Sequence, residues 1–140
     1  MMQVMLIKKL HEKGISVWVE SAGTSVHFSK PVDHTAKIIM FERGLSLEGY
    51  KSKPLIMSYP LVFDYVLTVD ESTKHEVAAE DMARTIIILN EKGGGVPLPV
   101  KDDLRSYDAC VSIIDKSLDD FIQAHITANI HSDVLNKYLQ

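Results

Sequence analysis

The sequence predicts an α/β fold, a three-layer sandwich with helices on both faces of a parallel sheet, and two observations indicate it. Short apolar runs that are typical of strands buried on both faces alternate with longer segments in which apolar residues recur at helical spacing. A polar stretch follows each predicted strand, and parallel sheets bind ligands at that edge. With 140 residues, the chain is long enough for one domain with a single core.

The first part of the chain predicts two helices and one strand. Residues 1–13 carry apolar side chains at helical spacing, and a glycine follows them. Residues 15–19 are β-branched and aromatic, so they predict a short strand. Asp33 is placed to cap a second helix over residues 35–43.

The middle of the chain predicts two buried strands separated by a helix. Residues 45–60 form a polar connection, and residues 65–69 then form a nearly continuous apolar run. Asp70 is placed to cap a helix over residues 71–82, and residues 85–89 predict the second buried strand. This order is that of a parallel β-α-β unit.

The last part predicts a glycine-rich loop and one long helix. Three consecutive glycines at residues 93–95 indicate a flexible loop. Residues 104–122 keep one apolar stripe for about five turns. We therefore expect one domain over residues 1–125 and a helical tail over residues 126–140, with a further helix around residues 134–139.

Composition argues against several classes of function. A net charge of −4 without a basic stripe indicates no nucleic-acid partner. The longest apolar runs, such as Ile86 to Leu89, are too short to cross a membrane, and the beginning of the chain does not resemble a signal peptide. A single cysteine, Cys110, excludes an intrachain disulfide framework and predicts a cytoplasmic location. The six histidines show no metal-ligand spacing, so no metal site is expected.

Four segments carry a family resemblance. They are Glu20-Ser21-Ala22-Gly23-Thr24, the helix start from Pro31 to Ala36, the loop Gly44-Leu45-Ser46-Leu47-Glu48-Gly49-Tyr50-Lys51-Ser52-Lys53-Pro54-Leu55, and Phe63-Asp64-Tyr65-Val66-Leu67-Thr68-Val69-Asp70. Their order and spacing resemble the low-molecular-weight protein tyrosine phosphatases, from the first helix to about Phe121. Tyr50 stands where many members carry histidine.

This resemblance implies hydrolysis of a phosphomonoester on a phosphoprotein, with phosphotyrosine or phosphoarginine as the expected substrate. In the family, a cysteine thiolate takes the phosphoryl group and water then removes it. Backbone N–H groups and the arginine of a Cys-x5-Arg loop bind the phosphate oxygens. An aspartate in a late loop protonates the leaving phenolate and later acts as a base. The family needs no metal, and no cofactor is expected here.

The resemblance also points to individual site residues. Asp102 matches the family's general acid, and Asp103 replaces the proline that follows it, so Asp103 is the alternative candidate. Asp103 is also expected to cap the last helix, and a purely structural interpretation leaves Asp102 as its solvated neighbour. His27 and Phe28 are candidates for the wall of the substrate cleft, or ordinary loop residues.

Two further residues are expected to support the site. Ser21 stands where the family orients its phosphate loop by a hydrogen bond, although here it could instead satisfy local backbone groups. Tyr50 lies in the loop that resembles a family motif, and we expect it to support the cleft.

The family's nucleophile is not found among these residues. Cys110 is followed six residues later by Lys116, and the residues between them continue a helix, which predicts a packed helix cysteine. The resemblance places the Cys-x5-Arg loop and the central strand of the sheet before Met1. We therefore expect a truncated domain that lacks this N-terminal central strand, exposes two strand edges and is inactive as it stands.

Other interpretations remain open. The chain could be a non-catalytic binding or regulatory pseudo-phosphatase that keeps the cleft without the nucleophile. Arsenate reductases share the fold, but the presence of a single cysteine disfavours their thiol relay. An unrelated α/β domain is the third possibility.

Overall fold

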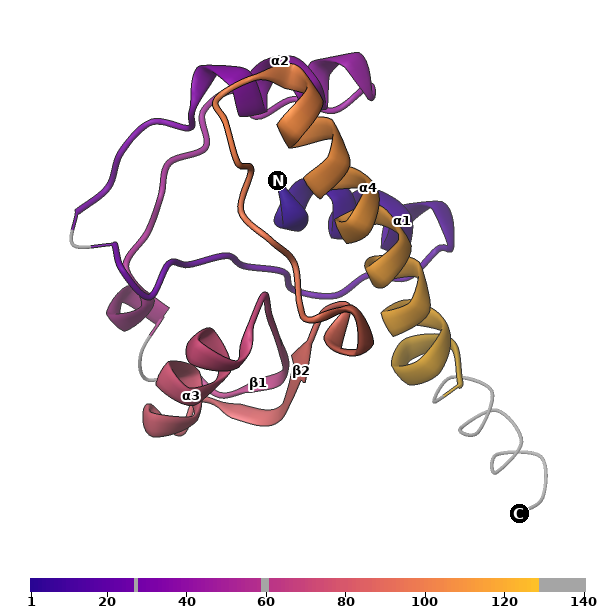
Figure 1. Ribbon diagram of the computed structural model, residues 1–140. Coiled ribbons are helices and arrows are strands. Elements are labelled where there is room, and N and C mark those ends of the chain that lie inside the picture. Colours follow the sequence, from indigo (N-terminus) through magenta and orange to yellow (C-terminus); the bar gives the residue numbers. More distant parts are fainter. Residues whose placement is uncertain (27, 59–60, 129–140) are drawn as a thin grey trace.

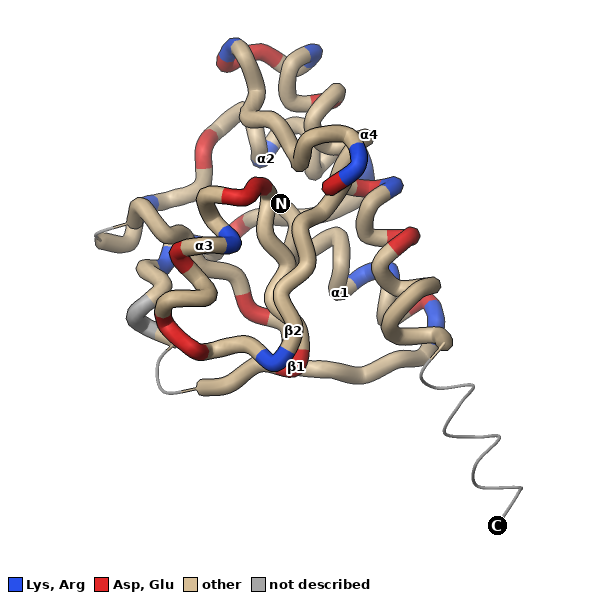
Figure 2. Tube along the Cα trace, turned by 60° about the horizontal axis from the view of Figure 1, so that its bottom comes forward, with Lys and Arg blue, Asp and Glu red and all other residues tan. Residues whose placement is uncertain are grey.

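The structure is a computed structural model that describes residues 1–26, 28–58 and 61–128, without the side chains of residues 56 and 57. In these ranges the main elements are α1 (Met2–Glu12), α2 (His34–Glu42), β1 (Phe63–Thr68), α3 (Glu71–Ala79), β2 (Ala83–Ile88) and α4 (Leu104–Phe121). The helix α3 covers one face of the sheet, and α1 and α4 lie on the other side (Figures 1 and 2). The predicted α/β class with a parallel sheet is confirmed.

The strands β1 and β2 pair in parallel, and α3 makes the crossover between them. Tyr65 lies opposite Thr85, and Thr68 opposite Ile88. The Leu89 N–H donates to the Thr68 carbonyl at 2.8 Å and so extends the ladder by one step. Both strands therefore end at the same edge, where their following loops begin.

One hydrophobic core fills the space between the sheet, α1, α2 and α4. The apolar stripe of α4 lies at its centre, with Val111 and Leu118 fully buried. Tyr65 of β1 packs edge-on against Phe121, with ring centroids 5.4 Å apart. Cys110 is also part of this core, which confirms the prediction of a packed helix cysteine.

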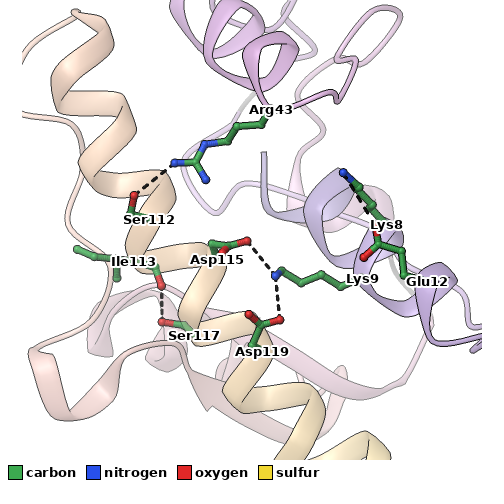
Figure 3. A network of polar contacts seen from close by, with 9 residues as sticks. All are labelled: Lys8, Lys9, Glu12, Arg43, Ser112, Ile113, Asp115, Ser117 and Asp119. Atoms are coloured by element: carbon green, nitrogen blue, oxygen red, sulfur yellow. Dashed lines mark hydrogen bonds and ion pairs between the residues drawn. The ribbon is translucent and has the colours of Figure 1, made fainter.

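Charged side chains tie α4 to α1 and α2 at the rim of the core (Figure 3). The Lys9 ammonium of α1 lies 2.9 Å from the Asp115 carboxylate and 2.8 Å from that of Asp119. Burial opposes the charge of Lys9, but hydrogen bonds and the negative charges of these two carboxylates outweigh it and raise the pKa of Lys9. Arg43, the residue that follows α2, makes the second link, because its guanidinium lies 2.8 Å from the Asp108 carboxylate of α4.

Residues 15–19, which were predicted to form a strand, join no ladder. In the part of the chain that the structure describes, β1 pairs with β2 alone, so no strand lies beside this segment. The Val19 carbonyl instead accepts a hydrogen bond from the Gln3 side chain at 3.2 Å. Val17 and Trp18 are exposed. The prediction was wrong because β-branched and aromatic residues form strands only where a neighbour pairs with them.

Helix boundaries differ from expectation by more than one residue at two places. The helix α3 ends at Ala79, three residues earlier than predicted. The helix α4 continues as a π-helix over Ile122–Thr127, and Ile126 packs against the core. The division at residue 125 remains a prediction, and the helix expected at residues 134–139 lies outside the described residues. None of the helices described is both long enough and apolar enough to cross a membrane.

Candidate functional site

The loops that follow β1 and β2 are tied together at the carboxyl edge of the sheet. The Val96 N–H donates to the Val69 carbonyl at 2.7 Å, and the Asn90 side chain donates to the Gly95 carbonyl at 2.8 Å. Gly95 has a φ of +93°, and a Cβ there would lie 2.3 Å from the Val69 oxygen. The loop that was predicted to be flexible is therefore a fixed turn that needs this glycine.

Two helix N-termini meet beside Asp102. Asp33 caps α2 by accepting from the Thr35 N–H at 2.9 Å, and Asp103 caps α4 by accepting from the Ser106 N–H at 2.8 Å. Both caps were predicted and are confirmed. The Thr35 hydroxyl donates to Oδ1 of Asp102 at 2.7 Å. The start of α2 thus holds the loop before α4, and the two helices lie side by side (Figure 1).

Tyr107 completes this group one turn into α4. Burial raises the pKa of its phenol, and the charges of Asp33 and Asp102 and a hydrogen bond with Asp33 raise it further. The phenol therefore stays neutral near neutral pH and can donate a hydrogen bond. We call Asp33, Thr35, Asp102 and Tyr107 the acid cluster.

The two candidate acids have different partners. Hydrogen bonds from Ser106, first from its backbone N–H, lower the pKa of Asp103. An aspartate whose ionised form is favoured in this way is poorly suited to deliver a proton near neutral pH. The exposed Asp102 does not cap the helix, and its Oδ1 accepts the hydrogen bond from Thr35. The two carboxyls are therefore held in different ways: Asp103 belongs to the cap of its own helix, and Asp102 is hydrogen-bonded to another helix.

The segment around Ser21 is fixed on α1 and on the loop that precedes β1. Ser21 donates its hydroxyl to the Gln3 side chain at 2.6 Å, so it does not satisfy local backbone groups. The Gly23 N–H donates to the Lys53 carbonyl at 2.9 Å, and the Lys53 ammonium lies 3.3 Å from the Glu20 carboxylate. Two of the segments that carried the family resemblance therefore lie side by side.

The expected cleft residues are not joined to the acid cluster. Phe28 is exposed, and the Lys30 ammonium lies 4.8 Å from its ring centroid. Tyr50 is 37% exposed. His27 lies outside the described residues. Across residues 1–26, 28–58 and 61–128, no hydrogen bond or ion pair links Ser21, Phe28 or Tyr50 to the acid cluster.

The cysteine shows no sign of a nucleophile. Burial raises the pKa of the Cys110 thiol, whereas a reactive cysteine needs a lowered one. In the portion of the chain that is described, no group of three or more histidine, cysteine or acidic side chains could hold a metal ion.

A comparison with protein families shows which family the chain resembles over nearly its whole length. The model of the family described as low molecular weight phosphotyrosine protein phosphatase matches residues 1–133. The chain belongs to this family. No curated protein matches the chain.

Solved structures of this kind share the fold of the chain. A low molecular weight protein tyrosine phosphatase from T. tengcongensis aligns with a TM-score of 0.69 at 19% identity, over 87% of each chain. Wzb from Vibrio vulnificus, solved in complex with benzylphosphonate, aligns with a TM-score of 0.67 at 18% identity, over 87% of this chain and 86% of its own. A third protein tyrosine phosphatase gives 0.66 at 20% identity, over 88% and 84%.

Two cavities lie outside the acid cluster of this phosphatase-family chain. One of about 450 Å³ lies between the end of β2 and α4, where Phe121 and His125 line it. One of about 340 Å³ lies between the Thr24–Val26 turn and α3. None of their lining residues belongs to the acid cluster. Asp102 therefore lines neither of these two cavities.

Sequence reasoning missed Thr35 and Tyr107 and took Asp33 only as a helix cap. Thr35 lies 67 residues from Asp102, and no local pattern joins the two. Tyr107 carried an available signal, because it lies five residues after the candidate acid and its phenol needs a polar partner where the apolar stripe begins.

Proposed function

We propose that this chain carries the leaving-group half of a phosphotyrosine phosphatase site, with Asp102 as the general acid. Membership of the phosphatase family supports a phosphomonoester substrate, most often on a phosphoprotein. The benzylphosphonate bound to Vibrio vulnificus Wzb joins an aromatic group to a phosphonate, as phosphotyrosine joins one to a phosphate. The observation that carries the assignment is the Thr35 hydrogen bond to Asp102, because it holds that carboxyl apart from the helix cap.

The proposed chemistry has two proton transfers. As the P–O bond breaks, Asp102 gives its proton to the phenolate oxygen, and its carboxylate then takes a proton from the water that attacks the phosphoenzyme. The step needs a cysteine thiolate to accept the phosphoryl group. These 140 residues contain no Cys-x5-Arg segment, so we propose that by themselves they do not turn over aryl phosphates. Cysteine usage supports a cytoplasmic setting.

A non-catalytic binding role is the second candidate. It is favoured by the buried Cys110, which leaves the chain without an accessible thiolate of its own. Arsenate reduction is less well supported, because a relay needs more than one cysteine and the sequence has one.

The test compares two proteins in one assay. One is the chain of 140 residues, and the other is the same chain joined at Met1 to the strand and Cys-x5-Arg loop of a family member. We expect only the completed protein to hydrolyse phenyl phosphate. In it, Asp102→Asn should lower kcat/KM by about 10²–10³-fold, as loss of a general acid does. Asp103→Asn should keep most of the activity, because asparagine also caps helices.

Two results would contradict the proposal. Hydrolysis by the chain of 140 residues, above that of its Cys110→Ser variant, would show that the nucleophile is present after all. A completed protein that has native circular dichroism but is inert would instead favour the binding role.

A further inference from the structure

We propose that Thr35 is a positioning residue that assigns different tasks to the two oxygens of the Asp102 carboxyl. Its hydroxyl occupies Oδ1, so the proton that goes to the leaving group is carried by Oδ2. This inference rests on the proposed role of Asp102 as the general acid.

The geometry of Thr35 suits it to hold another side chain. It is the second residue of α2, and its N–H is already bonded to Asp33. Its β-branched side chain has few rotamers in a helix, so its hydroxyl leaves the helix in a restricted direction. Because Asp102 lies in an exposed loop, this bond at 2.7 Å ties the loop to a regular element.

The bond also determines where a proton on Asp102 resides. A hydroxyl donor prefers the carbonyl oxygen of a carboxylic acid to its protonated oxygen, because the carbonyl oxygen is the better acceptor. With Thr35 on Oδ1, the acidic hydrogen therefore resides on Oδ2. When the P–O bond of the substrate breaks, this hydrogen passes to the phenolate oxygen, the carboxyl becomes a carboxylate, and Thr35 keeps its own hydrogen.

Two other titratable groups, Asp33 and Tyr107, lie near Asp102. Asp33 is a second negative charge near it, and the charges of both carboxylates add to burial in raising the pKa of the nearby Tyr107 phenol. Among the residues that the structure describes, the Thr35 hydroxyl is the group that donates a hydrogen bond to the Asp102 carboxyl. Fixing one oxygen of a catalytic carboxyl reduces the rotational freedom that would otherwise be lost in the transition state.

A second threonine–aspartate pair provides a matched control. The Thr73 hydroxyl donates to Oδ1 of Asp70 at 2.6 Å, at the start of α3. The two residues are three apart and belong to one helix cap, so this bond forms locally. The Thr35 bond has the same chemistry but joins two elements.

The first experiment uses the chain of 140 residues as it stands. Three-bond couplings to the threonine methyl carbons report the χ1 rotamers of Thr35 and Thr73 by NMR. We expect Thr35 to occupy a single χ1 rotamer in the parent chain. In the Asp102→Ala variant, we expect Thr35 to average over several rotamers, whereas the rotamer of Thr73 should stay the same. The proposal is overturned if Thr35 already averages in the parent chain, or if its rotamer is indifferent to Asp102→Ala.

The second experiment measures leaving-group dependence in the completed protein. Thr35→Val removes the hydroxyl and keeps the shape. We expect it to lower kcat/KM for phenyl phosphate about tenfold, and less for p-nitrophenyl phosphate, whose better leaving group needs less help from an acid. Thr35→Ser, which keeps a hydroxyl, should retain most of the activity that Thr35→Val loses. Thr73→Val should leave the ratio of the kcat/KM values for the two substrates unchanged.

The outcomes separate this inference from the proposed function. If Asp102→Asn has no effect on phenyl phosphate, the role of Asp102 as the acid fails. If Asp102→Asn lowers kcat/KM while Thr35→Val leaves kcat/KM unchanged for both substrates, or lowers it equally for both, the positioning role of Thr35 fails and the role of Asp102 stands.

Discussion

At the scale of single residues, Asp102 and Asp103 differ in what they hydrogen-bond rather than in exposure. Asp103 is fixed by the first turn of its own helix, and Asp102 by a residue of another helix. A cap can be predicted from sequence because its donor lies three residues away. The partner of Asp102 could not be predicted, because it depends on how α2 and α4 pack.

The cap at Asp103 should make stability depend on pH in acid. Hydrogen bonds from Ser106 lower the pKa of Asp103 in the folded chain below its ordinary value of 3.8. A carboxyl with a depressed folded pKa stabilises the fold above its unfolded pKa, and this contribution is lost as pH falls through the folded value. Asp103→Asn keeps a capping oxygen but cannot titrate.

We therefore expect the free energy of unfolding to fall less steeply in Asp103→Asn than in the parent as pH decreases below about 4. Urea unfolding followed by circular dichroism at several pH values measures this slope. Asp70→Asn should behave alike, because hydrogen bonds from Thr73 lower the pKa of Asp70 too. Parallel pH profiles for parent and variants would show that these caps are not linked to protonation.

At the scale of elements, local patterns predicted what depends on local contacts. The helices α1, α2 and α4 were predicted from apolar spacing and caps, and β1 and β2 from apolar runs. Residues 15–19 have an equally good strand composition but no partner strand in the described chain. The glycines at 93–95 predicted a loop but could not show that one of them is pressed against Val69.

Substitutions at Gly95 and at its neighbour Gly94 measure how much the close contact between Gly95 and the Val69 carbonyl matters for stability. Both have positive φ, at +93° and +87°, but a Cβ at Gly94 would meet nothing within 4 Å. Gly94→Ala should therefore cost only backbone strain, about 1 kcal/mol. Gly95→Ala adds a clash with the Val69 carbonyl, and we expect a loss of about 3–4 kcal/mol in the free energy of unfolding.

Urea unfolding of the two variants measures this difference, with the parent as reference. Equal losses at the two positions would mean that the loop moves away from Val69 at little cost. In that case the carboxyl edge would be less rigid than its hydrogen bonds indicate.

At the scale of the whole molecule, the sequence predicted the family and the α/β class, because its motifs keep their order along the chain. It did not predict how the helices are held together. Lys9 is only 16% exposed in its side chain and lies between Asp115 and Asp119 (Figure 3). The neighbouring Lys8 is 47% exposed and pairs with Glu12 at 3.9 Å within its own helix.

These two lysines should contribute unequally to stability. Lys9→Met leaves two carboxylates close together without their cation, and we expect it to lower the free energy of unfolding by about 1–2 kcal/mol. Lys8→Met should change it by less than about 0.5 kcal/mol, as expected for an exposed pair within one helix. Urea unfolding at low salt measures both, and equal effects would show that the link between α1 and α4 adds nothing to stability.

The exposure of Trp18 has a practical consequence. It is the one tryptophan of the chain, and 78% of its surface is open to solvent. An indole that is solvated in the folded chain has nearly the same surroundings after unfolding, so its emission is a poor signal of unfolding. The same indole will respond when another molecule covers residues 15–19, through a shift of its emission to shorter wavelength and a loss of quenching by iodide. The protein thus contains its own optical probe for whatever binds along that segment.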